Sequence, residues 1–430
     1  MQSFAKRQRA QAAAAVVGVD AGKFRHVLVV RPHDGHDSKP FAFDTTRVGF
    51  EAAVQFILAT AGSTTPVTPS LVLVGIEFAG AYGFTFAHYL RALGFGVVSV
   101  LPFDTKRWKE VTHHQPLKTD AKDALGITDL TATGHFVSFA FLDPAYAELR
   151  YLVSTRERFL KLRGAAVTRI TSTLELVFPE FTTVMPKLQS VSAMAVLEAF
   201  PSPEAILGTS RRRLTTVLSR ASLGHLGHET AEALQQAATT TLGLPLAQGA
   251  LSRELPLLVA QYRQLQAHLT IIEAEMARVL RALPEGPALL TVPYVSVVSA
   301  ATFLGSVGDV QAYDSSRQVL RLAGMSLVEH SSGTHQGQQR LSKRGRPTLR
   351  RHAFILALRW VRKDGPYRAA FEAMIARNGD VKMKAIIAIA RRALKILYTV
   401  ARERRPYTPL ATDGDSPYQD PGTGAADPAS

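Results

Sequence analysis

Residues 14–135 alternate between strand-like and helix-like segments, and this order limits the N-terminal third of the chain to a mixed α/β fold. The expected elements are strands at 14–20, 24–32 and 39–44, a helix at 46–62, a strand at 70–77, a helix at 81–93 and a strand at 95–102. The first two strands can pair as a hairpin. The run at 70–77 is rich in β-branched residues, which is typical of a strand buried in a parallel sheet. The pattern predicts a mixed sheet with an antiparallel start.

The remainder of the chain is predicted to be mainly helical. Long helices are expected at 143–181 and 250–283, with shorter helical segments between them at 185–245. The apolar spacing of three and four in the second long helix suits a coiled coil or a bundle, and it leaves a connector and a dimerisation device equally open. A further long helix is expected at about 367–403. The predicted domains are 1–140, a connector at 141–283, a C-terminal domain at 284–405 and a disordered tail at 406–430.

The charge balance favours a polyanionic partner. The 430 residues contain 50 Lys and Arg against 35 Asp and Glu, a net charge of +15, which points to nucleic acid or an anionic membrane. No apolar run reaches the ~18 residues of a membrane helix, so we expect no membrane partner. The absence of cysteine excludes disulfides and Cys-based zinc sites and fits a reducing compartment. The N-terminus imitates a signal peptide only faintly, and we expect a cytoplasmic protein.

Four carboxylates occupy positions where a metal site can form. Asp20 ends the first strand and Glu77 ends the buried strand, while Asp120 and Asp123 are three residues apart at the start of a helix and therefore share a face. Ligand sites of open α/β sheets form at the carboxyl ends of strands. Carboxylates gathered there repel one another unless a cation lies between them, and Mg²⁺ prefers such oxygens. Two such ions can clamp the attacking and leaving oxygens in phosphoryl transfer.

Each acid also has a structural interpretation. Asp120 and Asp123 could be first-turn acids that face a helix dipole, with Thr119 as the N-cap, and Asp20 could cap a turn. Glu77 is harder to explain in this way, because a carboxylate in an apolar strand is costly without a partner. The four acids together favour a magnesium site.

A polar loop and a basic stretch stand out in the C-terminal domain. Ser332 lies in the segment EHSSGTHQGQQR at 329–340, which by itself suits a solvated turn. From Arg340 to Lys363 there are nine Lys or Arg and no Asp or Glu. A basic run is usually a solvated face, but one without acids fits a surface that follows nucleic-acid phosphates. The expected phosphate-binding residues are Arg340, Lys343, Arg344, Arg346, Arg350 and Arg351, some of them on one helical face after Pro347.

Several motifs, in this order, resemble the DEDD transposases of the insertion-sequence one-ten family, its eleven-eleven branch included. They are the strand ending in Asp20, then IEFAGAYG (76–83), KTDAKDA (118–124), PYVSVVSAATFLGSVGD (293–309), SSRQVLRLAGMSLVEHSSG (315–333), RLSKRGRPTLRRHAF (340–354) and NGDVKMKAIIAIARRALKILYTV (378–400). Piv/MooV DNA invertases and bridge-RNA-guided recombinases are related to this family. The family usually carries Pro-Gly-x-Gly where this chain has Pro293-Tyr294-Val295-Ser296, so we do not expect phosphate binding at that turn.

The resemblance implies an α/β plus α architecture with an N-terminal RuvC-like (ribonuclease-H-type) domain, a helical connector and a mainly α C-terminal transposase domain. It implies that Asp20, Glu77, Asp120 and Asp123 are the DEDD metal ligands and that Ser332 is a nucleophile, with Ser331 leaving the register open by one residue. It further implies donor and target DNA and a structured non-coding guide RNA as partners. We expect a homo-oligomer, a dimer or tetramer, because two duplexes must be exchanged together.

Three alternatives remain at this point. A RuvC-like, Mg²⁺-dependent nuclease would use water in place of serine, and a covalent protein–DNA adduct would distinguish it from a recombinase. An actin-like sugar or acetate kinase would need a second Gly-rich phosphate loop, which the sequence after residue 150 lacks. A non-catalytic nucleic-acid-binding protein would leave the four carboxylates unexplained.

Overall fold

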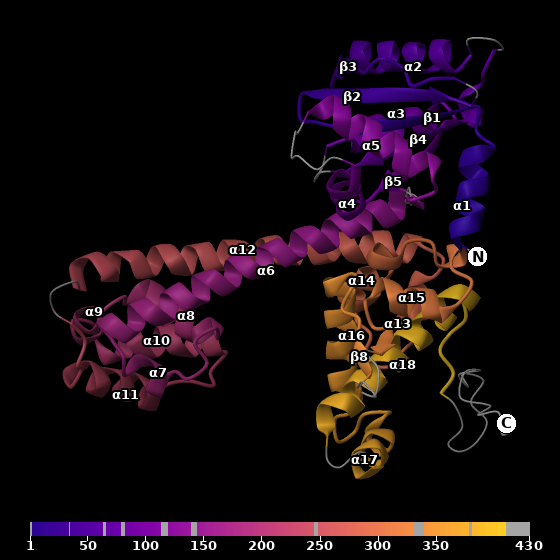
Figure 1. The fold of residues 1–430 in the computed structure, drawn as a ribbon. Coiled ribbons are helices and arrows are strands. Elements are labelled where there is room, and N and C mark those ends of the chain that lie inside the picture. The colour runs from indigo at the N-terminus through magenta and orange to yellow at the C-terminus, as the bar shows by residue number, and fades with distance from the viewer. Residues whose placement is uncertain are drawn as a thin grey trace. The chain divides into compact units, whose positions relative to one another are not determined.

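The computed structural model describes residues 2–33, 35–62, 66–78, 82–112, 119–138, 144–244, 248–329, 339–377 and 381–409. It divides into two compact units, Met1–Phe141 and Leu142–Ser430, whose helices and strands are shown in Figure 1. Among the helices that the structure describes, none combines the length and the apolar character needed to cross a membrane.

A mixed sheet of six strands forms the centre of the N-terminal unit, in the order β3-β2-β1-β4-β5-β6. The strands are β1 (Ala15–Ala21), β2 (Arg25–Pro32), β3 (Phe41–Asp44), β4 (Val72–Glu77), β5 (Gly96–Val100) and β6 (Val137–Ser138). β1, β2 and β3 pair antiparallel, whereas β1, β4 and β5 run parallel. The antiparallel start and the parallel centre that the sequence predicts are therefore both present, and β6 adds a short antiparallel edge.

Helices cover both faces of this sheet. They are α1 (Gln2–Gln11), α2 (Arg47–Ala61), α3 (Phe84–Ala92), α4 (Pro102–Thr112) and α5 (Asp120–Ala132), with a 3-10 turn at Pro69–Leu71 before β4. On one face, Ile57 of α2 and Leu90 of α3 pack with Val17 and Val19 of β1. On the other face, Ile127 of α5 packs with strand residues such as Val98, together with Ala10 of α1. The N-terminal segment that imitates a signal peptide forms helix α1, whose Ala10 packs in this core, and the first part of strand β1.

Two glycines let helix α5 lie unusually close to the sheet. Gly18 of β1 and Gly75 of β4 are register partners on adjacent strands. A Cβ atom at Gly18 would lie 2.4 Å from the Ala124 carbonyl oxygen, and one at Gly75 would lie 1.9 Å from Thr131 Oγ1. Real Cβ contacts are not this short, so any larger residue would push α5 away. The sheet therefore supports α5 on two side-chain-free positions, and this support sets where the first turn of α5 lies.

Two long antiparallel helices organise the second unit. α6 (Pro144–Val177) and α12 (Gln248–Ala282) match the two long helices that the sequence predicts, and they lie side by side in Figure 1. Polar pairs cross between them along their length, at Glu148–Arg278, Arg156–Glu273, Arg163–Gln266 and Arg169–Glu254. As the residue number rises along α6, the number of the partner on α12 falls, so the two helices run antiparallel.

The two ends of this helix pair belong to different hydrophobic cores. The end of α6 and the start of α12 pack with a small bundle, which we call the α7–α11 bundle. Its helices are α7 (Phe181–Val184), α8 (Val191–Ala199), α9 (Pro203–Leu207), α10 (Arg211–Ser222) and α11 (His228–Thr239). The start of α6 and the end of α12 instead pack into the C-terminal core. The long helices are therefore part of both cores as well as the link between them.

Within the described part of the chain, the C-terminal core contains six further helices and a short antiparallel strand pair, in addition to the ends of α6 and α12. The elements are α13 (Gly286–Leu290), α14 (Val297–Val307), the 3-10 turn Val310–Ala312, α15 (Ser316–Leu322), β7 (Leu327–Glu329), β8 (Gln339–Leu341), α16 (Pro347–Trp360), α17 (Arg368–Arg377) and α18 (Lys382–Glu403). The expectation of one helix over 367–403 is wrong, because α17 and α18 are separate helices. The segment 378–380 between them, and most of the tail predicted to be disordered, lie outside the described residues.

Candidate active site

Asp20 and Glu77 lie opposite each other on adjacent parallel strands. They are register partners of β1 and β4, at or next to the carboxyl end of each strand. Side chains two residues apart on a strand point to the same face, and Gly18 and Gly75 both face α5. Asp20 and Glu77 therefore face α5 as well, as a shared site requires.

Helix α5 brings the second pair of acids to the same edge of the sheet. Thr119 is its N-cap, and the Thr119 hydroxyl accepts a hydrogen bond from Lys122 N–H at 3.4 Å. Asp120 and Asp123 follow in the first turn, where the helix dipole favours negative charge. Asp123 is 8% exposed, whereas Asp120 is exposed. The structural interpretation of these two acids, as first-turn residues after the N-cap Thr119, is thus confirmed, and it coexists with their place beside the strand ends.

The pKa of Asp20 is affected by the other three carboxylates. The pKa of Asp20 is raised from 3.8 to about 6. Burial is the largest cause, followed by repulsion from Asp123, Asp120 and Glu77, while Lys109 acts in the opposite direction. Each of the other three acids therefore acts on Asp20, and together they form a single negatively charged site in this unit.

Lys109 of α4 also belongs to this site, although it was not among the residues predicted from the sequence. Its Nζ lies 2.6 Å from Asp123 Oδ1. Next to it, the Trp108 ring packs against α5 so closely that a Cβ at Gly126 would lie 2.6 Å from the ring. This contact holds α4 against α5 and keeps the ammonium group near the acids. Nothing in the local pattern of this exposed, basic helix distinguishes Lys109 from its neighbours, which is why it was missed.

The donor set fits a hard divalent cation in its chemistry. Carboxylate oxygens are the preferred ligands of Mg²⁺, and the buried Asp123 Oδ1 receives no hydrogen bond of good geometry despite the nearby Lys109 ammonium. As the side chains stand, however, no three His, Asp or Glu groups within the described ranges are close enough together to hold a metal ion. The structure thus gathers the four acids at one edge without closing them around a common point.

Two profiles of known transposases match the chain in order. Residues 17–179 match the IS110-type DEDD transposase profile, described as Transposase, and residues 286–372 match the profile described as Transposase IS116/IS110/IS902 family. The two matches together cover more than half of the chain and include all four acids. The chain belongs to the IS110 family of transposases. It is therefore a DNA transposase or recombinase.

Individual relatives agree with this assignment. The chain is 25% identical to the insertion element IS116 uncharacterized 44.8 kDa protein of Streptomyces clavuligerus, over 91% of this chain and 96% of that protein. It is 27% identical to the transposase for insertion sequence element IS1111A of Coxiella burnetii, over 31% of this chain and 38% of the relative. It is 30% identical to the pilin gene-inverting protein of Moraxella bovis, over 28% of this chain and 37% of the relative.

The candidate nucleophile of this IS110-family transposase follows β7 and precedes β8 in the sequence. Ser331 and Ser332 fall in the segment 330–338, which is outside the described residues. The strands that flank the segment, β7 and β8, pair antiparallel with Glu329 opposite Gln339. The assignment of the serine therefore rests on the sequence.

The basic stretch that follows is divided between structural and exposed residues. Arg346 donates a hydrogen bond to the Ser306 carbonyl, and burial lowers the pKa of its guanidinium. Arg350 Nη1 donates to the Ala323 carbonyl at 2.9 Å, and Arg351 forms an ion pair with Glu157. These three arginines help to hold the C-terminal core together. Only Arg350 and Arg351 of the six lie on α16, so the expected common helical face is limited to them. Of the six expected residues, Arg340, Lys343, Arg344 and Arg351 are exposed, so Arg351 both pairs with Glu157 and faces solvent.

The turn at Pro293–Ser296 keeps a glycine-like backbone without glycine. Tyr294 has φ +61°, in the left-handed region that disfavours residues with a Cβ by about 1–2 kcal/mol. Trp360 Nε1 donates to the Pro293 carbonyl at 2.8 Å and supports the turn. The turn therefore has at Tyr294 a backbone conformation that glycine adopts more readily than tyrosine.

Proposed function

We propose that this transposase cuts and rejoins DNA through a divalent-cation site formed by Asp20, Glu77, Asp120 and Asp123. The observation that carries the proposal is the in-register placement of Asp20 and Glu77 facing the acidic first turn of α5. The strand order, with an antiparallel hairpin followed by parallel strands, supports the RuvC-like, ribonuclease-H-type assignment of this unit. Mg²⁺ is the cation proposed, because the donors are carboxylate oxygens.

The protein's own groups have distinct tasks in this site. Bound Mg²⁺ would polarise a DNA phosphate and stabilise a departing oxygen. Asp20 and Glu77 supply oxygens from rigid strand ends, which hold them in place, while Asp123 supplies an oxygen from a buried position. Asp120 is exposed at the start of α5 and supplies the most accessible carboxylate. The raised pKa of Asp20 means that protons compete with the cation below about pH 6.

We further propose Ser332 as the nucleophile. A bond forms between the serine Oγ and phosphorus as the P–O bond to one DNA end breaks; the serine proton passes to a base, and the departing oxygen leaves as a hydroxyl after it takes up a proton. The resulting phosphoserine conserves the phosphodiester energy for rejoining. The support is the family resemblance around SSG at 331–333 and the absence of cysteine. A structured guide RNA, donor and target DNA and a homo-oligomer are proposed on the same resemblance.

A trapping experiment tests the chemistry and separates it from hydrolysis. The protein is incubated with DNA carrying the element ends and with RNA transcribed from its flanks, the reaction is stopped in denaturant, and the DNA-linked peptide is sequenced. Wild-type protein and Glu51→Gln, an exposed acid of α2, should give an adduct on Ser332. Asp20→Asn and Asp123→Asn should give neither adduct nor cleavage while DNA binding persists. An adduct on Ser331 moves the register by one. Cleavage without any adduct, persisting in both serine-to-alanine variants, would identify water as the nucleophile.

A further inference from the structure

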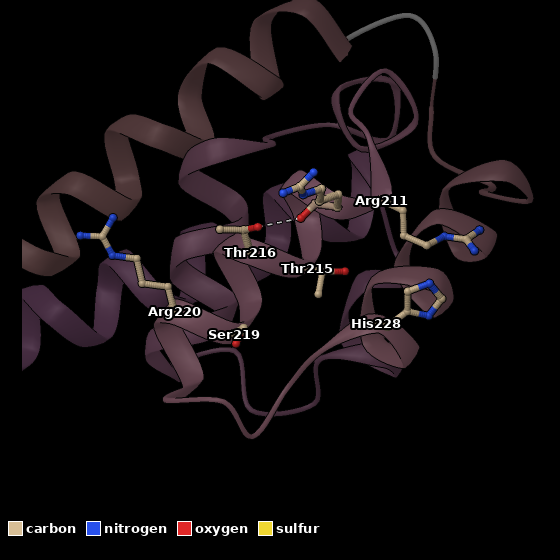
Figure 2. Close-up of a pocket in the computed structure, with 7 residues that line it drawn as sticks. Arg211, Thr215, Thr216, Ser219, Arg220 and His228 are labelled. Atoms are coloured by element: carbon tan, nitrogen blue, oxygen red, sulfur yellow. Dashed lines mark hydrogen bonds between the residues drawn. The ribbon is translucent and has the colours of Figure 1, made fainter.

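The α7–α11 bundle carries a basic surface that neither matched profile covers, because the profiles end at residue 179 and resume at 286. From residue 205 to residue 228 there are four arginines, two histidines and no Asp or Glu. A hollow of about 650 Å³ opens there, lined by Arg211, Arg212, Thr215, Thr216, Ser219, Arg220 and His228. Figure 2 shows the Thr215 side chain between α10 and His228, the first residue of α11. The hollow therefore combines cationic groups with hydroxyl donors.

Three arginines begin α10, where a helix favours acidic residues over basic ones. Arg211, Arg212 and Arg213 follow the N-cap Ser210 directly, and the first turn contains no acid. The positive end of the helix dipole lies there, so each exposed cation is disfavoured by about 0.3–1 kcal/mol at low salt. An anion bound beside this turn would reverse that repulsion, because the arginines, the free N–H groups and the dipole would all act on it together.

Two of the arginines already have intramolecular partners, and two do not. Arg211 lies 3.3 Å from Glu232 and donates to Gln235, and Arg213 stacks over the Phe200 ring at 5.8 Å. Arg212 and Arg220 are exposed and form no ion pair with any residue that the structure describes. They are eight residues apart on one side of α10, so they are separated by about 12 Å along the helix axis. One strand of duplex DNA carries about three to four phosphates over that axial length.

The hydroxyl groups of the hollow supply the second kind of phosphate contact. Thr215 Oγ1 is buried and has no hydrogen-bond partner among the described residues. An unsatisfied buried hydroxyl is costly. Because Thr215 lines the hollow, rotation of its side chain toward the hollow would let a ligand oxygen accept a hydrogen bond from it and relieve that cost. Thr216, by contrast, already donates to the Arg212 carbonyl at 2.8 Å, as drawn in Figure 2. Hydroxyls beside arginines are the usual side-chain partners of phosphate oxygens in nucleic-acid complexes.

We infer that the hollow on the α7–α11 bundle binds the phosphate backbone of nucleic acid, with Arg212 and Arg220 as the cationic contacts and Thr215 as a hydroxyl donor. The contacts are to phosphate alone, so they position the nucleic acid without reading its sequence. DNA and RNA share this backbone chemistry, and the experiment distinguishes them. The inference does not depend on the metal chemistry proposed above.

Salt-dependent binding of the full-length protein tests the inference. Binding to a 30-base-pair duplex and to a hairpin RNA, both of arbitrary sequence, is measured by fluorescence anisotropy in EDTA between 50 and 200 mM KCl. Loss of two duplex phosphate contacts in Arg212→Ala/Arg220→Ala should lower the log–log salt slope by about 1.8, at roughly 0.9 per contact. Over this fourfold range of salt, the affinity of the double variant should then fall about tenfold less than that of the wild type.

The matched control removes the same charge elsewhere on the same unit. Lys187 and Arg253 are exposed residues outside the hollow, and Lys187→Ala/Arg253→Ala should leave the slope near the wild-type value. Thr215→Val, which removes an unsatisfied hydroxyl and so should keep the fold intact, should weaken binding several-fold without changing the slope. If the slope of Arg212→Ala/Arg220→Ala changes only with the duplex probe, the site binds DNA. If it changes only with the hairpin probe, the site binds RNA. Equal slopes for the two double variants on both probes would overturn the inference. Because EDTA removes divalent cations, this assay measures binding without the proposed metal site. A negative result would therefore overturn the inference about the hollow and leave the proposed metal chemistry untouched.

Discussion

Asp20 shows how the charge of a single residue connects the fold to the proposed chemistry. Its folded-state pKa of about 6 exceeds the ordinary 3.8, so the metal-free folded state holds this proton more tightly than the unfolded state does. The free energy of unfolding therefore falls as the pH rises from about 4 to about 6. Ionised Asp20 therefore weakens the fold in the absence of a cation, because it is buried and lies near the other three acids.

Asp20→Asn should remove that part of the pH dependence. Asn cannot ionise, so the metal-free variant should be more stable than the wild type at pH 7 and should lose this advantage near pH 4. Thermal unfolding in EDTA at several pH values between 4 and 7 measures the difference. Parallel stability curves for the two proteins would show that Asp20 does not titrate in this range.

Lys109 is the second residue whose replacement should change the thermal stability of the protein in a predictable direction. Its ammonium contacts Asp123 Oδ1 at 2.6 Å and compensates one of the carboxylates. Lys109→Met should destabilise the metal-free protein, because the buried Asp123 loses its counter-charge, and it should increase the stabilisation gained from added Mg²⁺. The midpoint of thermal unfolding with and without Mg²⁺ measures both effects. Lys106→Met, an exposed lysine of the same helix, is the control; an equal Mg²⁺ response in the two variants would contradict this role for Lys109.

At the scale of elements, the distance between α5 and the sheet decides whether the acids meet. The closest contact is the one between Gly75 of β4 and Thr131 of α5. Gly75→Ala should destabilise the protein by about 1–3 kcal/mol, which is typical of overpacking, and should lower cleavage activity by moving the first turn of α5.

A double-mutant cycle tests whether the stability lost in Gly75→Ala comes from the contact with Thr131. Thr131→Ala removes the Oγ1 that the new Cβ would strike, at the loss of its hydrogen bond to the Ile127 carbonyl. In the Gly75→Ala background it should recover part of the lost stability, giving a coupling of about 0.5–3 kcal/mol in urea unfolding. If the stability changes of the two single variants simply added in the double variant, the close approach of α5 to Gly75 would not be the cause of the lost stability.

The sequence predicts the elements of the N-terminal unit better than it predicts their contacts. The apolar run at 70–77 and the hairpin at 14–32 carry their own periodic signals, and β4, β1 and β2 appear where those signals lie. The strand-end positions of Asp20 and Glu77 follow from the same pattern. The glycine support of α5 and the approach of Lys109 depend on packing between elements far apart in the chain, and no local pattern encodes them.

The C-terminal unit shows a different limit of sequence analysis. A basic run near 340–363 suggests one phosphate-binding surface, but Arg346 and Arg350 instead donate to backbone carbonyls of the core. Charge composition cannot distinguish an arginine that binds a carbonyl from one that faces solvent. The single helix expected at 367–403 failed for a related reason: the propensity of the flanking residues is helical on both sides, and the pattern gave no weight to the Asn-Gly-Asp at 378–380.

At the scale of the whole molecule, the proposed catalytic groups are divided between two compact units. The four acids belong to Met1–Phe141, and the serine belongs to Leu142–Ser430. Between them along the chain lie α6, the α7–α11 bundle and α12, and the two long helices pack in both the bundle core and the C-terminal core. A homo-oligomer could therefore combine the acids of one protomer with the serine of another, and this arrangement would make catalysis depend on assembly.

Mixing two inactive variants tests that arrangement. Ser332→Ala and Asp20→Asn should each lack recombination activity alone. If the site is composite, mixed oligomers contain some sites with intact acids from one chain and an intact serine from the other, so activity should partly return. The mixture is assayed for recombinant DNA and for the covalent adduct, which should form only on the Asp20→Asn chain because the other chain has no serine.

A tagged version of each variant identifies which chain carries the adduct, and this makes the result specific. A mixture of Asp20→Asn with Asp123→Asn is the matched control, because both variants damage the acids of the same unit and neither can supply an intact set. Subunits must be mixed before assembly, by co-expression, so that slow exchange does not hide the effect. Activity in the first mixture but not in the second would place the serine and the acids of one site on different chains. An inactive first mixture, with mixed oligomers shown to be present, would mean that each protomer completes its own site.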